Sequence, residues 1–418
     1  MNPRTRPLRL SVALLLLAVP ALAQDAAAKR PITHEDVWLA ARLSAPALSP
    51  DGKWAVVGVT EPAYDDKQQV SDLWIVPTDG SAPARRLTSS PGGEASPAWS
   101  PDGTRLAFTA RRDGDEVSQV YVLDTRGGEA QRVTTLATGA RSPRWSPDGN
   151  SLLFVSDVYP GAKTEAENKA AAQERKNRKW NARVFDSFPI RDWDRWLDDR
   201  QPSLFVQAVA PDSAAKDLLA GTTLAAHPGF GGSLGAGSEN ITAAWTPDGS
   251  AVVFTATANR HESAFAEVVQ SLWLVPVAGG EPRRLTPDVA SYGAPAFSPD
   301  GKVLYASVQP ESEKVYTHGR LARWNWPAMD GRAVITQGFD RAVGTYRPAP
   351  DGTSVFLLAE DEGYEKLYTV PRVSPEAKVA PTWGSSTKTM SPSSCWAWWV
   401  MPMVASPFST RTHSCSLV

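Results

Sequence analysis

One short phrase recurs along this chain of 418 residues and restricts what the chain can fold into. The phrase is an apolar residue, Ser or Thr, and then Pro-Asp-Gly, and a β-rich run follows each copy. In this phrase Pro presets φ, Asp bonds the backbone ahead of it and Gly accepts positive φ, so each copy predicts a β-hairpin. The sixth copy is weaker because Ala349 replaces the Ser or Thr. The prolines stand at positions 50, 101, 147, 247, 299 and 350, with spacings of 51, 46, 100, 52 and 51 residues.

Each unit also predicts further strands. A second β-rich signature follows the hairpin, as in residues 73–76, 120–123 and 272–275, and a short Arg-apolar-Thr run comes next. With the strand that leads into the hairpin, each unit has four strands. Four antiparallel strands repeated about every 50 residues predict an all-β fold, a β-propeller of four-stranded blades. Six units are recognisable, and we expect them to form an incomplete seven-bladed ring.

The spacing of 100 residues indicates one blade with two insertions. After Pro147 the second strand is normal, whereas the third (203–206) comes late and the fourth is expected near 216–219. The first insertion covers about residues 159–200 and contains a charged, Ala-rich stretch that predicts an exposed helix. The second is a Gly-rich loop at 227–240. We therefore expect a helical insertion in the third blade.

The end of the first insertion supplies the candidate binding residues. These are Trp193, Asp194, Trp196, Asp198 and Asp199. Aromatic rings and carboxylates on an insertion could hold a substrate, for instance by its amino terminus. The alternative is a salt-bridged segment that fixes the insertion to the propeller through its Trp residues. Charge runs are more often solvated faces, which favours the alternative.

A search for catalytic and metal-binding motifs yields no site. Residues 231–235 match the Gly-x-Ser-x-Gly elbow, but they lie in a loop without the strand and helix that this motif needs, so Ser233 is not predicted to be a nucleophile. None of the five histidines has a partner at a metal-ligand spacing. We predict no catalytic residue, metal or cofactor.

The first residues predict export. A basic start, a short apolar run and Ala21-Leu22-Ala23 are typical of a signal peptide over residues 1–23, cleaved before Gln24. The apolar run is shorter than the about 20 residues that cross a bilayer, so no membrane span is expected after cleavage. A net charge of −2 gives no global attraction to nucleic acid. The expected location is periplasmic or secreted.

The last segment departs from the repeats. We expect the propeller to occupy residues 30–380, and we interpret residues 381–418 as an aberrant tail that a reading-frame change would explain. The alternative is a natural, divergent tail. Both cysteines, Cys395 and Cys415, lie in this tail. A propeller that lacks closing strands would expose blade edges and apolar faces.

The residues also resemble a known family. The Trp-Ser-Pro-Asp-Gly blades, the run at 154–161 and the insertion behind it are similar to the prolyl oligopeptidase family, in particular its dipeptidyl-peptidase V and acylaminoacyl-peptidase-like members. The resemblance covers about residues 30–370. It implies a propeller that restricts access to small peptides, helps to hold their amino end and caps an α/β-hydrolase domain with a Ser-Asp-His triad. We expect no such domain in this chain.

Two functions follow. The first is the substrate-gating propeller of an exported serine peptidase that cleaves small peptides, of the dipeptidyl or acylaminoacyl type, with this chain inactive by itself. Its partner is then a small peptide. The alternative is a stand-alone, TolB-like periplasmic propeller that binds a protein or ligand.

Overall fold

The computed structural model describes residues 30–65, 68–180, 182–185, 188–192, 194–235, 238–310, 317–372 and 380–381. The predicted signal peptide and residues 382–418 of the predicted tail lie outside these residues. Contacts divide the chain into two units, residues 1–40 and 41–418. Among the described residues, no helix has the length and apolar character needed to cross a bilayer.

The described part of the first unit contains one short helix, α1 (His34–Trp38). Thr33 caps it in a reciprocal arrangement, because its hydroxyl accepts from the backbone N–H of Asp36 while the Asp36 carboxylate accepts from the backbone N–H of Thr33. Both oxygens of that carboxylate also accept hydrogen bonds from Arg30. Local hydrogen bonds therefore define where this helix begins.

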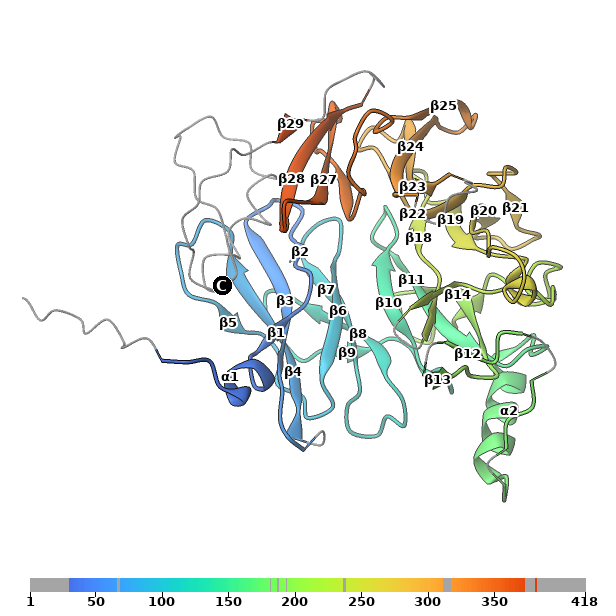
Figure 1. The fold of residues 1–418 in the computed structure, drawn as a ribbon. Helices are drawn as coiled ribbons and strands as arrows, with labels where there is room; N and C mark the ends of the chain where they lie inside the picture. The colour runs from blue at the N-terminus through green and yellow to red at the C-terminus, as the bar shows by residue number, and fades with distance from the viewer. Residues whose placement is uncertain are drawn as a thin grey trace, which may run out of the picture. The chain divides into compact units, whose positions relative to one another are not determined.

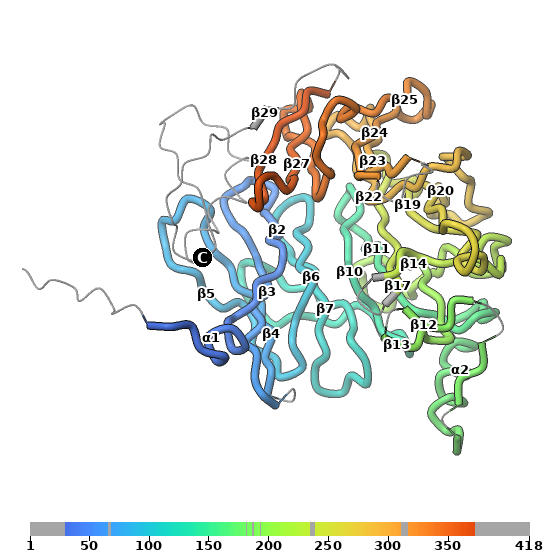
Figure 2. The backbone as a smooth tube through the Cα atoms, in the orientation of Figure 1, coloured from blue at the N-terminus to red at the C-terminus, as the bar shows by residue number. Residues whose placement is uncertain are grey.

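The second unit is a β-propeller of six blades, which follow one another around a central axis from blue to red (Figures 1 and 2). Each blade is an antiparallel sheet whose four main strands pair in chain order. β1 (Arg42–Leu43) adds a fifth strand to the first sheet by pairing with β3. The blades are: β2 (Ala47–Leu48), β3 (Trp54–Glu61), β4 (Val70–Pro77), β5 (Arg85–Arg86); β6 (Glu94–Trp99), β7 (Arg105–Ala110), β8 (Gln119–Asp124), β9 (Gln131–Arg132); β10 (Arg141–Trp145), β11 (Ser151–Val158), β14 (Gln201–Ala208), β15 (Lys216–Asp217); β18 (Ala243–Trp245), β19 (Ala251–Ala256), β20 (Ser271–Pro276), β21 (Arg283–Arg284); β22 (Ser291–Phe297), β23 (Val303–Gln309), β24 (Arg320–Asn325), β25 (Asp330–Val334); and β26 (Tyr346–Pro348), β27 (Ser354–Asp361), β28 (Tyr364–Pro371), β29 (Ala380–Pro381).

The Pro-Asp-Gly phrase forms the turn between the first two strands of each blade. In the first blade the Ser49 hydroxyl donates to the Asp51 carboxylate at 2.6 Å and accepts from the backbone N–H of Trp54. Gly52 has φ +70°, a value that a side chain would strain. The same hydroxyl–carboxylate bond occurs in blades 2 to 5. Ala349 has no hydroxyl, so the sixth turn lacks this bond, although the Asp351 carboxylate still accepts from the backbone N–H of Thr353.

The core lies between neighbouring blades rather than within one blade. Successive side chains of a strand point to opposite faces of its sheet. In β11, Leu152 and Phe154 thus pack toward the second blade, while Leu153 and Val155 pack toward the fourth. Five such clusters join blades 1 to 6 in order. Within the described part of the chain, no core cluster joins the sixth blade to the first.

The sixth blade differs from the expectation. In the sequence the sixth unit loses the repeat pattern after Val370, but Ala380 and Pro381 pair with β28 as a fourth strand. A two-residue strand without the Arg-apolar-Thr pattern carries too little local signal to be predicted. The described residues form six blade sheets and two further sheets of two strands each, so the blades match the six units recognised in the sequence.

The first insertion is confirmed as helical and lies in the third blade. It leaves β11 and returns to β14, which pair without a shift over eight residues. It contains α2 (Glu165–Asn177) and a small hairpin of β12 (Arg191–Asp192) and β13 (Arg195–Trp196). The second contains a hairpin of β16 (Ser233–Gly235) and β17 (Ser238–Asn240). A 3₁₀ turn, η2 (Arg260–Glu262), follows β19.

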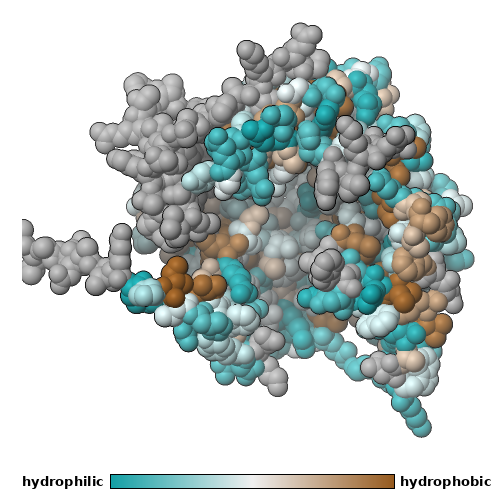
Figure 3. Space-filling view, viewed as in Figure 1, coloured by the Kyte–Doolittle hydropathy of each residue, from teal (hydrophilic) through white to brown (hydrophobic). Residues whose placement is uncertain are grey.

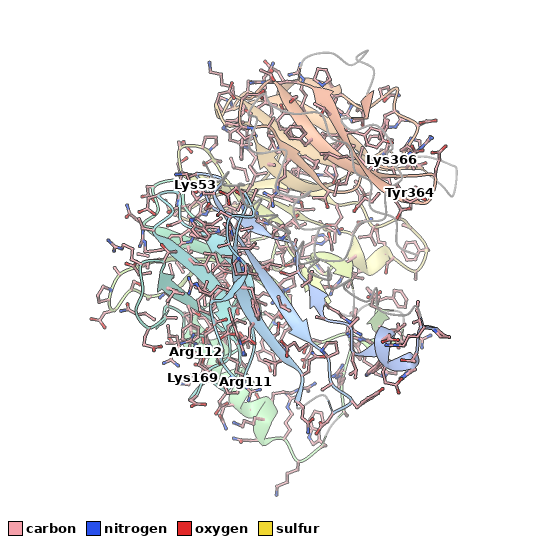
Figure 4. The ribbon with its side chains drawn as sticks, turned by 90° about the vertical axis from the view of Figure 1, so that its left-hand side faces the viewer. Lys53, Arg111, Arg112, Lys169, Tyr364 and Lys366 are labelled. Carbon is pink, nitrogen blue, oxygen red and sulfur yellow. The ribbon has the colours of Figure 1, made fainter. Side chains whose placement is uncertain are left out.

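The propeller has two ends. The Pro-Asp-Gly turns lie at one end of the strands, and we call it the hairpin face. The connections between second and third strands, including the first insertion, lie at the other end, the insertion face. Figure 4 labels Lys53 at the hairpin face, and Arg111, Arg112 and Lys169 at the opposite end of the strands. Lys176 of α2 pairs there with Glu116 of the β7–β8 connection at 3.1 Å.

Candidate functional site

The end of the first insertion presents part of the predicted site to solvent. Asp194 is exposed at the turn between β12 and β13, and it bonds to no other described residue. Trp196 is 60% exposed, and its ring stacks on Phe185 with 6.4 Å between centroids. Trp193 lies outside the described residues. An exposed carboxylate and an exposed indole therefore stand close together in the chain on this insertion.

The other two candidates are paired with arginines. The Asp198 carboxylate accepts two hydrogen bonds from the Arg200 guanidinium, at 3.0 and 2.7 Å, a bidentate arrangement. Burial raises the pKa of Asp198, but the Arg200 bonds outweigh it and hold that pKa below its usual range. Asp199 pairs with Arg175 of α2 at 3.2 Å. Both carboxylates thus hold the insertion together, and both remain partly exposed.

A buried amide joins α2 to the propeller. Asn168 is 2% exposed although it lies on a charged helix. Its carbonyl oxygen accepts from the backbone N–H of Tyr159, and its amide donates to the Thr138 hydroxyl, each at 3.0 Å. Glu165, in the first turn of α2, accepts from the backbone N–H of Ala137 at 2.7 Å. These bonds position the insertion over the junction of the second and third blades.

Tertiary structure adds a charged network that the sequence analysis missed. Arg141, on the innermost strand of the third blade, donates to the Asp157 carboxylate at 2.8 Å and to the backbone carbonyl of Glu239 at 2.9 Å. The side chain of Glu239 is only 9% exposed and pairs with Arg260. The hydrogen bonds to Asp198 are the main cause of the raised pKa of Arg200, and the Asp157 charge raises it further. Charges of alternating sign therefore run from the first insertion to the inner edge of the third blade.

No spacing in the sequence signals this network, because its members come from both insertions and from two blades. Glycines permit the close approach of the second insertion. A Cβ at Gly231 would lie 3.0 Å from the Arg260 side chain, and one at Gly229 would lie 2.2 Å from the carbonyl oxygen of Ala258. The Gly-rich loop is thus a packing device that brings Glu239 to Arg260.

The Gly-x-Ser-x-Gly match and the histidines form no catalytic or metal site among the described residues. Ser233 is exposed at the start of β16, and a β-hairpin rather than a helix follows it. The strand–turn–helix context of a nucleophile elbow is absent there. The rings of His227 and His261 lie 5.8 Å apart. Among the described residues, no group of three or more His, Cys, Asp or Glu could hold a metal ion.

The sequence is similar to the propellers of known peptidases. Residues 68–178 match the family described as the Tricorn protease N-terminal beta propeller domain. Dipeptidyl-peptidase 5 of Porphyromonas gingivalis is 25% identical over 343 residues, which cover 81% of this chain and 48% of that protein. The propeller region is consistent with the propeller of a prolyl oligopeptidase family peptidase.

Solved structures show the same fold. Pyrococcus horikoshii acylaminoacyl peptidase aligns over 84% of this chain and 47% of its own, with a TM-score of 0.56 and 16% identity. The beta-propeller domain of the Trilobed protease from Pyrococcus furiosus aligns over 82% of this chain and 86% of its own, with a TM-score of 0.52 and 15% identity. The chain spans about half the length of the curated relatives it matches. The described residues contain no α/β-hydrolase domain.

Proposed function

We propose that this chain supplies the substrate-gating propeller of a serine peptidase that cleaves small peptides, of the dipeptidyl or acylaminoacyl type. The observation that carries the proposal is the match to dipeptidyl-peptidase 5 of Porphyromonas gingivalis over 81% of this chain. The helical insertion of the third blade, with its exposed carboxylate and indole, supplies chemistry suited to a peptide. A propeller of this kind would admit short peptides and hold them for a catalytic domain.

The proposed binding site for the amino end of the peptide is the end of the first insertion. A peptide ammonium group forms its strongest hydrogen bonds with ionised carboxylates. Asp194 is available for such a bond, and Trp196 offers an exposed ring face for the adjoining side chain or cation. Asp198 and Asp199, held by Arg200 and Arg175, would add negative charge on the same segment. Trp193, directly before Asp194 in the chain, belongs to the same proposal.

Peptide binding by the full 418-residue chain tests this assignment. A tripeptide with a free amino group should bind about tenfold more tightly than its N-acetyl counterpart, because the acetyl group removes a charge-assisted hydrogen bond. Asp194→Asn should remove that preference. Asp113→Asn is the matched control, since Asp113 is an exposed carboxylate of the β7–β8 connection on the insertion face. Equal binding of both peptides by the unchanged chain would count against the site.

The chain by itself is proposed to lack peptidase activity. Dipeptidyl and N-acyl-aminoacyl derivatives of a fluorogenic amine should not be hydrolysed by the purified chain. Hydrolysis that Ser233→Ala abolishes would overturn the proposal and make this chain an enzyme in its own right. Binding of a folded protein without binding of short peptides would instead support a stand-alone binding propeller.

We also propose that the chain is exported and that residues 1–23 are removed. The basic start and short apolar run before Gln24 support this proposal. Expression of the full chain in a Gram-negative bacterium, followed by fractionation and amino-terminal sequencing, tests it. Mature protein in the periplasm or medium that begins at Gln24 is the expected result, and an intact amino terminus in the cytoplasm is the opposing one.

A further inference from the structure

One position of the innermost strand is equivalent in all six blades. It lies two residues before the Ser or Thr of the hairpin phrase, or before Ala349 in the sixth blade. The strand register confirms the equivalence, because each of these residues is the Cα partner of a residue near the start of the next strand. Four of the six are alanine and two are arginine. In blade order they are Ala47, Ala98, Arg144, Ala244, Ala296 and Arg347.

The two arginines lie on opposite sides of the propeller axis. They belong to the third and sixth blades, which are three blades apart in a propeller of six. Figure 3 shows a hollow in the middle of the blades. Arg144 and Arg347 are both accessible to solvent on innermost strands. Arg144 also lines a cavity of about 40 Å³ with polar residues that include Ser142 and Thr242.

Both guanidinium groups are partly desolvated, and they repel one another. Protein around each side chain lowers the pKa of both arginines by desolvation. Repulsion from Arg347 lowers the pKa of Arg144 further, so the two charges act on one another across the hollow. A side chain that is open to solvent and yet partly desolvated is expected where water fills a narrow central channel.

Neither arginine has a carboxylate partner within the part of the chain that the structure describes. Other arginines of the propeller do: Arg141 pairs with Asp157, Arg86 with Asp72 and Arg372 with Asp300. Two unpaired like charges in a confined channel are costly unless an anion lies between them. The planar guanidinium group matches a carboxylate in particular, because it can donate two parallel hydrogen bonds.

We propose that Arg144 and Arg347 form a carboxylate-binding site in the central channel, and that this site holds the C-terminal carboxylate of a peptide. The identity of the ligand as a peptide rests on the proposed function, whereas the anion site itself does not. The arrangement gives a peptide two places of opposite charge, carboxylates on the first insertion and arginines in the channel.

The repeat itself supplies the test variants. Arg144→Ala and Arg347→Ala introduce the residue that the other four blades have at this position, so both should fold. Arg144→Lys and Arg347→Lys keep the positive charge and lose the planar fork. Because each Ala variant removes a repulsion, neither should unfold at a lower temperature than the unchanged chain in the absence of anions.

The binding experiment compares a tripeptide with its C-terminal amide on the full chain by calorimetry. The free acid should bind about tenfold more tightly than the amide, each Ala variant should lose that preference, and the Lys variants should retain part of it. Benzoate should compete with the free acid.

Equal binding of acid and amide, or a preference unchanged in both Ala variants, overturns the inference while leaving peptide binding intact. If benzoate raises the unfolding temperature in an Arg144-dependent and Arg347-dependent way but no peptide binds, the anion site stands and the proposed function fails. A preference for an internal Asp or Glu over the C-terminal carboxylate overturns only the assignment of the ligand group.

Discussion

The indole nitrogen of Trp145 donates a 3.0 Å hydrogen bond to the backbone carbonyl oxygen of Ala98, which lies on the neighbouring blade. Trp99 donates in the same way to Ala47 and Trp245 to Arg144, so three Trp residues join the first four blades near the axis. The Arg105 guanidinium also lies 4.5 Å from the centre of the Trp145 ring. The Trp of the hairpin phrase therefore joins neighbouring blades through a bond that Phe297 and Pro348, at the same position of the fifth and sixth blades, cannot form.

Trp145→Phe should lower the free energy of unfolding by about 1–2 kcal/mol, because it removes one hydrogen bond and leaves a half-buried carbonyl oxygen without its donor. Thermal and urea unfolding of the full chain measure the effect. Trp245→Phe is the matched control: its bond is longer, at 3.2 Å, and more exposed, so its cost should be smaller. A larger cost for Trp245→Phe would contradict this account of the inter-blade bond.

Phe154→Ala should cost about 3–5 kcal/mol, the usual range for a fully buried ring that leaves a cavity. Phe154 is 0% exposed, lies between the second and third blades and stacks on Phe205 with 5.7 Å between centroids. Phe265→Ala provides the comparison, because Phe265 is 81% exposed and should change stability little. Similar unfolding temperatures for the two variants would refute a core located between blades.

Acid should destabilise the propeller through its hairpin turns. Hydrogen bonds from Ser or Thr lower the pKa of the turn Asp residues, and that of Asp102 falls from 3.8 to about 2. A carboxylate whose pKa is lower in the folded state stabilises that state above about pH 3.8, and this stabilisation is lost as pH falls toward 2.

Asp102→Asn should therefore reduce the slope of unfolding temperature against pH between pH 4 and 2, while it lowers stability at neutral pH. Asp113→Asn serves as the control, because Asp113 is exposed and bonds to no other described residue. An unchanged slope in Asp102→Asn would show that the hairpin carboxylates do not govern the acid response.

Asn168→Ala should release the first insertion without unfolding the blades. The substitution removes the bonds from α2 to Tyr159 and Thr138 and should speed proteolysis or amide exchange within residues 165–177 by about tenfold or more. Lys169→Ala, at the neighbouring exposed position labelled in Figure 4, should leave both rates unchanged. Equal protection in the two variants would mean that other contacts hold the insertion.

Local features were the part of this protein that the sequence could predict. Hydrogen bonds of Ser49 with Asp51 and Trp54 close the Ser-Pro-Asp-Gly turn. All of these residues lie within a short stretch of sequence, so a local motif predicts the turn. Alternating apolar strands at a regular spacing predict blades that pack face to face, as β11 does. The long segment between residues 158 and 201 correctly indicated an insertion in the third blade, because β11 and β14 pair along their full length on either side of it.

The sequence by itself thus determined the repeat, the four-stranded blade and the place of the insertion. Only the tertiary structure decided which charges meet. Arg144 is repelled by Arg347 although the two residues belong to the third and sixth blades, and the backbone of Glu239 reaches Arg141 because the second insertion folds back on the third blade. The physical reason is that hydrogen bonds within a turn depend on neighbours in the chain, whereas electrostatic contacts across a channel depend on the angular order of whole blades.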